Sequence, residues 1–348
     1  MTTRVLIVDD SRTMRALLAQ MLSRAPGIEV IGQAADAHEA RVMMRELNPD
    51  VVTLDIEMPG MSGLEFLDKI MRLRPTPVII VSGNTRAGCE TTVRALELGA
   101  VDCIAKPNNA VPGALENFGL ELAELVRSAA GVSCWHASHS AQSDNVVRQS
   151  LELSSSGRSN TRLIAIGAST GGVEALHHLL PAFPADCPPT LIVQHISAAF
   201  APAMAERLDT KCTAKVMLAE PGIPLQPGHI YIAPGNDRHL VLSTAEKLVT
   251  RLMPGDLISG HRPSIDALFE SVAKLIGPSA VGILLTGMGA DGARGLLAMR
   301  KAGSRTIAQD EATCTVYGMP RAAAELGAAE KILPLPRIAE RALAGAAA

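Results

Sequence analysis

The sequence predicts two α/β domains, each built on a parallel sheet with helices on both faces. Short apolar runs alternate with helical patterns in both halves of the chain, as in doubly wound folds. The length of 348 residues is more than twice that of a typical domain, which has about 150 residues. Between the halves, residues 128–160 contain ten serines and no sustained apolar period. We therefore expect domains at residues 1–126 and 161–348, joined by a flexible linker at 127–160.

The first half contains five strand patterns in regular alternation with helix patterns. Apolar or β-branched runs mark the strands at residues 5–8, 30–32, 51–54, 78–81 and 101–105. Helical patterns lie between them, and the last one runs to about residue 126. Because parallel strands need a crossover connection, which is usually a helix, these units predict one five-stranded parallel sheet.

The second half repeats the same alternation. Its strand patterns lie at residues 163–166, 191–193, 230–232, 281–285 and 306–308. Helical segments separate most of these runs. The pattern predicts a second doubly wound α/β domain.

Composition and charge exclude several classes of protein. Lys and Arg number 32 against 35 Asp and Glu, for a formal net charge of -3, so the chain lacks the basic field of a nucleic-acid-binding protein. Aromatic residues make up 2%, which leaves little for base stacking. No apolar stretch approaches the length of about 20 residues that spans a bilayer, and residues 1–10 end in two acids, unlike a signal peptide. We expect a cytoplasmic protein that binds no nucleic acid and does not insert into a membrane.

Polar residues follow four of the five predicted strands in the first half. Asp9 and Asp10 follow the first strand, Asp55 the third, Ser82 the fourth and Lys106 the fifth. Ligands of open parallel sheets gather at the carboxyl ends of the strands, so we expect these side chains to meet. Three carboxylates that meet repel one another and favour a hard cation such as Mg2+. Acids after strands also serve as helix caps, but the whole set in this order favours phosphoryl transfer onto one carboxylate.

This arrangement closely resembles the receiver domains of two-component response regulators, over about residues 3–126. The resemblance implies a flavodoxin-like fold in which Asp55 accepts the phosphoryl group and shares a Mg2+ ion with the two acids of the first strand. It also implies that Ser82 and Lys106 contact the phosphoryl oxygens. Three positions before the lysine, where receivers usually carry an aromatic residue, this chain has Cys103. A Tyr or Phe rotamer switch therefore cannot relay phosphorylation at that position.

The second half begins with a serine on a glycine-rich turn. Residues 163–172 read as strand, tight turn and helix, with Gly167, Ser169 and Gly171 in a G-x-S-x-G spacing. As a dinucleotide fingerprint the turn is defective, because Ser169 stands where a second glycine lets the backbone approach a pyrophosphate. The next strand ends in His195 rather than in the acid that a ribose needs. The spacing instead favours a nucleophilic serine beside helix N-terminal amides.

Two further strand ends supply partners for this serine. His195 follows the neighbouring strand and can act as a general base, while Asp291 lies on a glycine-rich turn after a later strand and can orient the imidazole. The chain order Ser169, His195, Asp291 differs from the Ser, acid, His order of α/β-hydrolases, so that fold is not implied. Each residue also has a structural interpretation, as a cap or a turn residue. Together they predict a triad, with backbone amides of Met288 and of the turn around Thr170 as the oxyanion hole.

Five motifs in the second half resemble, in order, those of the CheB family of chemotaxis protein-glutamate methylesterases. They are Gly-Ala-Ser-Thr-Gly-Gly at 167–172, Gln-His at 194–195, Arg-Pro-Ser-Ile-Asp at 262–266, Leu-Thr-Gly-Met-Gly-Ala-Asp-Gly at 285–292 and Ala-Gln-Asp-Glu-Ala at 308–312. The resemblance implies hydrolysis of glutamate γ-methyl esters, and deamidation of glutamines, on the cytoplasmic helices of methyl-accepting chemoreceptors. It implies a chemotaxis histidine kinase as phosphodonor, Mg2+ in the receiver domain and no cofactor in the catalytic domain. We expect the unphosphorylated receiver to cover the Ser169 edge, and phosphorylation of Asp55 to release it.

Two rival functions stay open on the residues alone. The second domain could have kept its fold and only dock on receptors, although all three residues of the triad are present. It could also hydrolyse another acyl substrate, as a general esterase or a peptidase does, because a triad does not by itself set the substrate. Only the family resemblance selects the methylesterase over this second rival.

Overall fold

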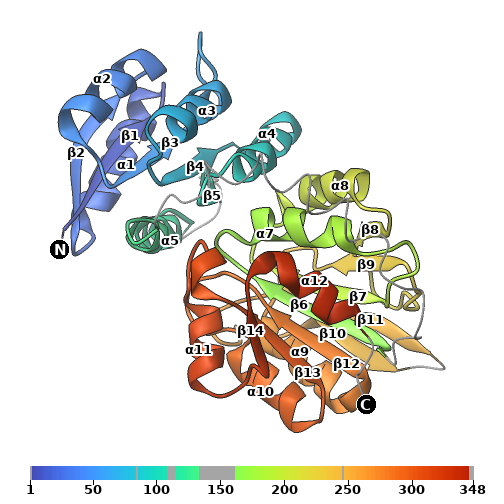
Figure 1. Ribbon diagram of the computed structural model, residues 1–348. Helices are drawn as coiled ribbons and strands as arrows, with labels where there is room; N and C mark the ends of the chain where they lie inside the picture. The colour runs from blue at the N-terminus through green and yellow to red at the C-terminus, as the bar shows by residue number, and fades with distance from the viewer. Residues whose placement is uncertain (1, 84, 108–113, 133–160, 245–246, 345–348) are drawn as a thin grey trace. The chain divides into compact units, whose positions relative to one another are not determined.

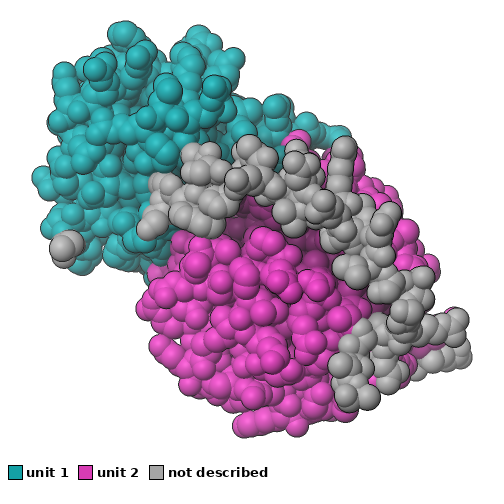
Figure 2. All heavy atoms as spheres, in the orientation of Figure 1, with its two compact units in different colours: residues 1–142 teal, residues 143–348 magenta. Residues whose placement is uncertain are grey.

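The computed structural model describes residues 2–83, 85–107, 114–132, 161–244 and 247–344. The chain divides into two compact units, residues 1–142 and 143–348 (Figure 2). Most of the predicted linker, at residues 133–160, lies outside the described residues. The last helix of the first unit ends at Ala129, slightly beyond the predicted boundary at residue 126.

The first unit contains a five-stranded parallel sheet in the order β2-β1-β3-β4-β5 (Figure 1). Its strands are β1 (Thr3–Val8), β2 (Ile28–Ala34), β3 (Val51–Leu54), β4 (Val78–Ser82) and β5 (Asp102–Ala105). Its helices are α1 (Arg12–Arg24), α2 (Ala37–Leu47), α3 (Gly63–Leu73), α4 (Arg86–Glu97) and α5 (Ala114–Ala129). The predicted parallel sheet is confirmed, and its strand order is that of flavodoxin-like folds.

Local sequence signals place the elements around the carboxyl end of this sheet. Every residue of β3 and β4 is buried, as expected for inner strands of a sheet covered on both faces. The helix α3 begins with a capping box, because the Glu65 amide donates to the Ser62 hydroxyl and the Ser62 amide donates to the Glu65 carboxylate. Because Asp55 directly follows β3, it lies at the carboxyl end of an inner strand of the sheet.

The second unit contains a seven-stranded parallel sheet in the order β14-β13-β12-β6-β7-β9-β8. Its strands are β6 (Leu163–Ala168), β7 (Thr190–Gln194), β8 (Lys215–Leu218), β9 (His229–Ile232), β12 (Ala280–Leu284), β13 (Arg305–Gln309) and β14 (Lys331–Leu333). Its helices are α7 (Gly172–Leu179), α8 (Ala201–Lys211), α9 (Ile265–Leu275), α10 (Ala293–Lys301), α11 (Met319–Glu325) and α12 (Leu335–Leu343). Leu163 and Ala165 of β6 share one apolar core with residues of α9 and α10. The predicted α/β domain is confirmed.

Four strands of this unit were not predicted. The strands β8 and β14 form the two edges of the sheet, where strands are short and partly exposed and therefore lack a long apolar run. The other two, β10 (Arg238–Thr244) and β11 (Leu248–Pro254), pair with each other as an antiparallel hairpin, and β11 also forms an isolated antiparallel bridge between Val249 and Pro224. Neither β10 nor β11 belongs to a strand-helix-strand unit, so the alternation that revealed the parallel sheet does not include them.

Candidate active site

Three adjacent strands of the second unit bring the predicted Ser, His and Asp to one edge of the sheet. The strand β6 pairs with β7 on one side and with β12 on the other. Ser169 follows β6, His195 follows β7, and Asp291 lies on the loop after β12. The His195 amide donates to the Ala168 carbonyl at 2.9 Å. The ends of β6 and β7 are therefore tied together beside the serine.

Ser169 begins a sharp turn, residues 169–171, that we name the serine turn. The Gly172 amide donates to the Ser169 carbonyl at 2.7 Å, and Gly171 has a φ of 75°, which favours glycine. The loop after β12 packs closely on this turn, because a Cβ added at Gly287 would lie 2.6 Å from the Ser169 Cβ. A larger residue at position 287 would push that loop away from the serine.

His195 and Asp291 form a buried pair. The Nε2 atom of His195 lies 2.9 Å from Oδ2 of Asp291, and the two side chains are 10% and 0% exposed. The other ring nitrogen of His195, Nδ1, is buried and has no hydrogen-bond partner in the part of the chain that the structure describes. With Nε2 donating to the carboxylate, Nδ1 is the nitrogen that is left to accept a proton.

The start of α9 holds Asp291 in place. Its Oδ2 accepts from the Ile265 amide at 2.7 Å, and its Oδ1 accepts from the Ser264 hydroxyl at 2.8 Å and the Asp266 amide at 3.0 Å. Burial alone would raise the pKa of Asp291, but His195 and, to a smaller extent, the Asp266 and Ile265 amides lower it below its usual value. His195 and the start of α9 thus together keep the carboxylate ionised, since the positive end of a helix favours an anion.

A second histidine, which the sequence did not single out, packs against this pair. The ring of His261 stacks on that of His195, with centroids 3.8 Å apart and planes 11° apart. Burial, with a smaller contribution from the charge of His195, lowers the pKa of His261 to about 4 despite the opposing effect of Asp291. His261 is therefore neutral near pH 7 and presents a flat, uncharged face to His195.

A tight turn fixes the position of His261. Ile258 and His261 exchange backbone hydrogen bonds of 3.1 and 3.0 Å across Ser259 and Gly260, which have φ angles of 53° and 82°. The Ser259 hydroxyl donates to Oδ2 of Asp266 at 2.7 Å. Because Asp266 lies in the first turn of α9, the same helix start holds both the turn and Asp291.

We expect His261→Phe to remove a pH-dependent loss of stability while keeping the stacked ring. A neutral native histidine with a pKa of about 4 binds fewer protons below pH 6.5 than the unfolded chain does, so wild-type stability falls as the pH drops from 6.5 toward 4. Allowing for partial solvent exposure, the loss between pH 7.5 and pH 5 amounts to about 1 kcal/mol. Urea unfolding of both full-length proteins at the two pH values measures it. An equal loss in both proteins would show that His261 does not cause it.

The two predicted oxyanion residues lie on the serine turn and on the loop that packs on it. Thr170 follows Ser169 in the serine turn and is 3% exposed. Met288 lies on the loop after β12 and is 37% exposed. The Gly287 amide donates to the Val316 carbonyl at 3.0 Å, which fixes the backbone just before Met288. Thr170 is therefore part of the serine turn, and Met288 belongs to the loop that packs on it.

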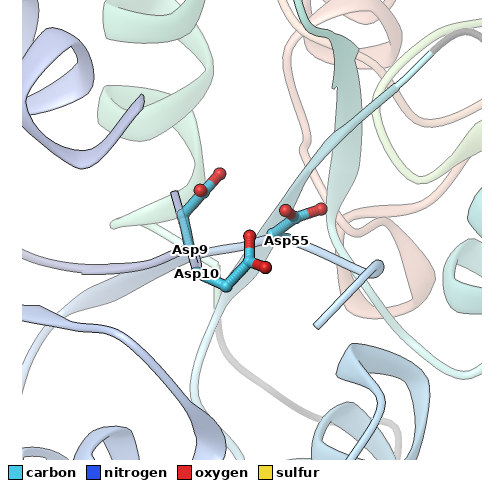
Figure 3. A group of neighbouring side chains, drawn as sticks. All are labelled: Asp9, Asp10 and Asp55. Carbon is cyan, nitrogen blue, oxygen red and sulfur yellow. The ribbon is translucent and has the colours of Figure 1, made fainter. Parts of the chain in front are cut away.

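A cluster of charged side chains lies at the carboxyl end of the first sheet. One carboxylate oxygen from each of Asp9, Asp10 and Asp55 lies within 4.8 Å of the others (Figure 3). The ammonium of Lys106 lies 2.6 Å from Asp55 Oδ2 and 2.9 Å from Asp9 Oδ2. The contact with Asp9 is an ion pair without hydrogen-bond geometry, since Asp9 Oδ2 has no hydrogen-bond partner among the described residues. Three carboxylate oxygens with spare lone pairs fit a hard divalent cation such as Mg2+.

Burial and charge act in opposite directions on this cluster. Burial raises the pKa of Asp55 above its usual value, and Asp9 adds to this, although Lys106 lowers it. Burial would lower the pKa of Lys106, but its contacts with Asp55 and Asp9 raise it overall. The lysine is thus a fixed positive charge beside two carboxylates that repel each other.

The remaining predicted residues of this site lie as follows. Ser82 is fully buried at the end of β4, and its hydroxyl donates to the Gly83 carbonyl at 3.4 Å. In β5, Cys103 occupies the position where receivers usually have an aromatic residue, and burial raises the pKa of its thiol. Among the predicted groups of this site, the structure therefore brings Lys106 and the three acids together, whereas Ser82 bonds to its neighbour.

No helix in the described part of the chain has the length and apolar character needed to cross a bilayer.

Comparison with known proteins assigns both units. Residues 164–342 match the family model of the CheB methylesterase, and residues 5–112 match that of the response regulator receiver domain. The solved catalytic domain of the CheB methylesterase from Thermotoga maritima is similar to the second unit. It has a TM-score of 0.51 and 36% identity, and the match covers 53% of this chain and 97% of that one.

Curated relatives match nearly the whole chain. A protein-glutamate methylesterase/protein-glutamine glutaminase of Agrobacterium fabrum is 52% identical, over 98% of this chain and 95% of that protein. A protein-glutamate methylesterase/protein-glutamine glutaminase 1 of Caulobacter vibrioides is 53% identical, over 95% of this chain and 94% of that protein. The chain therefore belongs to the CheB methylesterase family, with a response regulator receiver domain preceding its methylesterase domain.

Proposed function

We propose that the protein is a phosphorylation-activated hydrolase that demethylates glutamate γ-methyl esters and deamidates glutamines on the cytoplasmic helices of chemoreceptors. The observation that carries this proposal is the buried His195–Asp291 pair of 2.9 Å at the strand ends next to Ser169. Relatives with these two activities in their names cover nearly the whole chain. We place its action in the cytoplasm, where those receptor helices lie.

In the acylation step, Ser169 attacks the side-chain carbonyl of the substrate. Nδ1 of His195, which has no other partner in the described chain, takes the hydroxyl proton as the serine oxygen bonds to the carbonyl carbon. The tetrahedral intermediate then collapses, and its C–O or C–N bond breaks. The leaving group takes the proton back from His195 and departs as methanol from an ester or as ammonia from an amide.

Water completes the reaction by the same route in reverse. His195 removes a proton from a water molecule, whose oxygen attacks the acyl-enzyme carbonyl, and the bond to the Ser169 oxygen breaks as that oxygen regains the proton. The product is a glutamate carboxylate on the receptor. Methyl ester and amide substrates therefore give the same product.

Asp291 and the backbone provide the electrostatic part of the mechanism. Asp291 is kept ionised by His195 and by the amides at the start of α9, so it can stabilise the imidazolium that forms during each transfer. We assign the oxyanion hole to the amides of Thr170, which follows the serine in the serine turn, and of Met288, on the loop that packs on this turn. One good donor of this kind contributes about 3 to 4 kcal/mol to the rate.

The first unit regulates this chemistry as a receiver. We propose that Asp55 accepts a phosphoryl group from a chemotaxis histidine kinase, while Lys106 and Ser82 contact the phosphoryl oxygens. Asp9, Asp10 and Asp55 would hold Mg2+, which when bound neutralises phosphoryl oxygens. The short contacts of Lys106 with Asp55 and Asp9 support this assignment, because they place a cation where the charge of the phosphoryl group would arrive.

We expect Asp10→Asn to weaken Mg2+ binding at least about tenfold, because it removes one anionic oxygen ligand from the set of three. Isothermal titration of the full-length protein with Mg2+ measures the affinity. The side chain is exposed, so the thermal midpoint in the absence of Mg2+ should stay within a few degrees of wild type. Equal Mg2+ affinity in the two proteins would remove Asp10 from the ligand set.

The proposed function is tested by methanol release from a purified receptor cytoplasmic fragment that carries methylated glutamates. The full-length protein is assayed with and without Mg2+ and a small-molecule phosphodonor. We expect release that rises about 5- to 150-fold with the phosphodonor, which is the range of a coupling free energy of 1 to 3 kcal/mol. No release, despite a phosphorylated receiver, would favour a binding module. Turnover of simple esters but not of the receptor fragment would favour another acyl substrate.

A further inference from the structure

Two consecutive carbonyls of the serine turn are each held by a buried side chain. Nε2 of Gln194 donates to the Ser169 carbonyl at 2.8 Å, and the Thr286 hydroxyl donates to the Thr170 carbonyl at 3.0 Å. Gln194 and Thr286 are 2% and 1% exposed, so water does not compete for these bonds. Gln194 is the last residue of β7 and Thr286 lies on the loop after β12, and these two strands flank β6, one on each side.

Gln194 ties the serine to the histidine. Its Nε2 also donates to the His195 carbonyl at 3.1 Å, so one amide group bridges the backbone of the serine and that of the base. The opposite amide orientation would place Oε1 against two carbonyl oxygens, which accept but do not donate. Oε1 instead faces Gly172, where an added Cβ would lie 2.1 Å from it. The glycine therefore leaves room for the bridge.

Thr286 ties the serine turn to a third segment, residues 313–317. Its hydroxyl oxygen accepts from the Val316 amide at 2.9 Å. The single hydroxyl hydrogen goes to the Thr170 carbonyl at 3.0 Å, which is nearer than the Val316 carbonyl at 3.3 Å. The Thr286 carbonyl in turn accepts from the Ser169 amide at 3.0 Å. Thr286 thus contacts the turn on both sides of the serine.

We propose that Gln194 and Thr286 are positioning residues that set the orientation of the two peptide planes after Ser169. A peptide unit is planar, so holding its carbonyl oxygen also sets the direction of the N–H on its other side. Fixing the planes after Ser169 and after Thr170 therefore fixes the backbone that carries the serine hydroxyl. The inference rests on the proposed role of Ser169 as nucleophile. A displacement of about 1 Å at a reacting group lowers the rate up to about 100-fold.

The test compares Thr286→Val with Thr286→Ser in the full-length protein. Valine has the shape of threonine but no hydroxyl, whereas serine keeps the hydroxyl that bridges Thr170 and Val316. With the methylated receptor fragment, we expect the valine variant to lose about 10- to 100-fold in kcat with little change in KM. The serine variant should restore kcat to within about threefold of wild type. Gln194→Met, which removes both donors, should also lower kcat about tenfold.

Thr306→Val is the matched control for stability. The Thr306 hydroxyl is fully buried in the same sheet, donates to the Ala328 carbonyl at 2.7 Å and accepts from the Glu330 amide at 3.0 Å. It therefore makes the same pair of bonds as the Thr286 hydroxyl but has no contact with the serine turn. We expect Thr306→Val and Thr286→Val to lower the thermal midpoint by similar amounts, and only Thr286→Val to lower kcat.

The outcomes separate this inference from the proposed function. If Ser169→Ala is inactive but Thr286→Val and Gln194→Met turn over like wild type, the positioning role is wrong and the nucleophile stands. Equal losses of kcat in Thr286→Val and Thr306→Val would also overturn it, because they would trace the effect to general stability. If Ser169→Ala keeps wild-type activity, Ser169 is not the nucleophile, and the proposed mechanism is wrong independently of the positioning role. Labelling of Ser169 by a fluorophosphonate, measured by intact mass, should slow in Thr286→Val and not in Thr306→Val.

Discussion

Replacing Ser169 with alanine is expected to lower methanol release from the methylated receptor fragment by at least about 10⁴-fold in kcat. The substitution removes the only atom that can form the acyl-enzyme in the proposed mechanism. Its effect on folding should be small, because the backbone bonds of the serine turn are made by the amide and carbonyl of Ser169. The measurement is initial-rate kinetics for wild type and variant, with thermal midpoints for both.

Ser304→Ala is the control for this substitution. Ser304 precedes β13 in the same sheet, is 5% exposed, and its hydroxyl donates to the Gly277 carbonyl at 2.7 Å. Its loss should cost some stability and leave kcat unchanged. A Ser169→Ala protein that keeps more than a few per cent of wild-type turnover would falsify the acyl-enzyme mechanism.

In the Asp291→Asn variant, kcat for methanol release should also fall about 10⁴-fold, because the amide no longer stabilises the imidazolium of His195.

The strand ends that carry both candidate sites were predictable from the sequence. Asp55 directly follows the strand pattern at residues 51–54, and His195 lies two residues after the apolar run at 191–193, and the carboxyl ends of parallel strands share one edge. The structure places His195 against Asp291 and Lys106 against Asp55, as a common edge requires. The catalytic and regulatory roles of these residues remain predictions.

Other parts of the sites depend on geometry that no periodic pattern encodes. His261 reaches His195 through a two-residue turn in a segment without a strand pattern, and its only sequence signal is its place directly before the motif at residues 262–266. Gln194 and Thr286 lie inside predicted motifs. Their contacts join side-chain donors to backbone carbonyls of the serine turn, and such contacts depend on the exact approach of neighbouring strand ends.

Replacing Asp55 with asparagine is expected to abolish phosphoryl incorporation from a small-molecule phosphodonor and the rise in methanol release that follows it. An amide lacks the anionic oxygen that attacks phosphorus. Burial raises the pKa of Asp55, which means that the folded state holds its ionised form less favourably than the unfolded chain does. Removing that charge should therefore not unfold the receiver, and Lys106 keeps its contact with Asp9. Phosphoryl incorporation is measured by electrophoresis in gels that slow phosphorylated proteins, and stimulation is measured by the methanol assay. Both use the full-length protein.

Asp68→Asn is the control for this variant, because Asp68 lies on α3 in an ion pair with the exposed Arg72 and is not one of the three acids of the cluster. It should take up the phosphoryl group and respond like wild type. A phosphorylated Asp55→Asn protein would place the acceptor on another carboxylate, with Asp9 and Asp10 as the nearest alternatives. Loss of phosphorylation with full stimulation by the phosphodonor would instead separate the receiver from the control of Ser169. Basal methanol release equal to that of wild type is expected in either variant, since neither residue belongs to the catalytic unit.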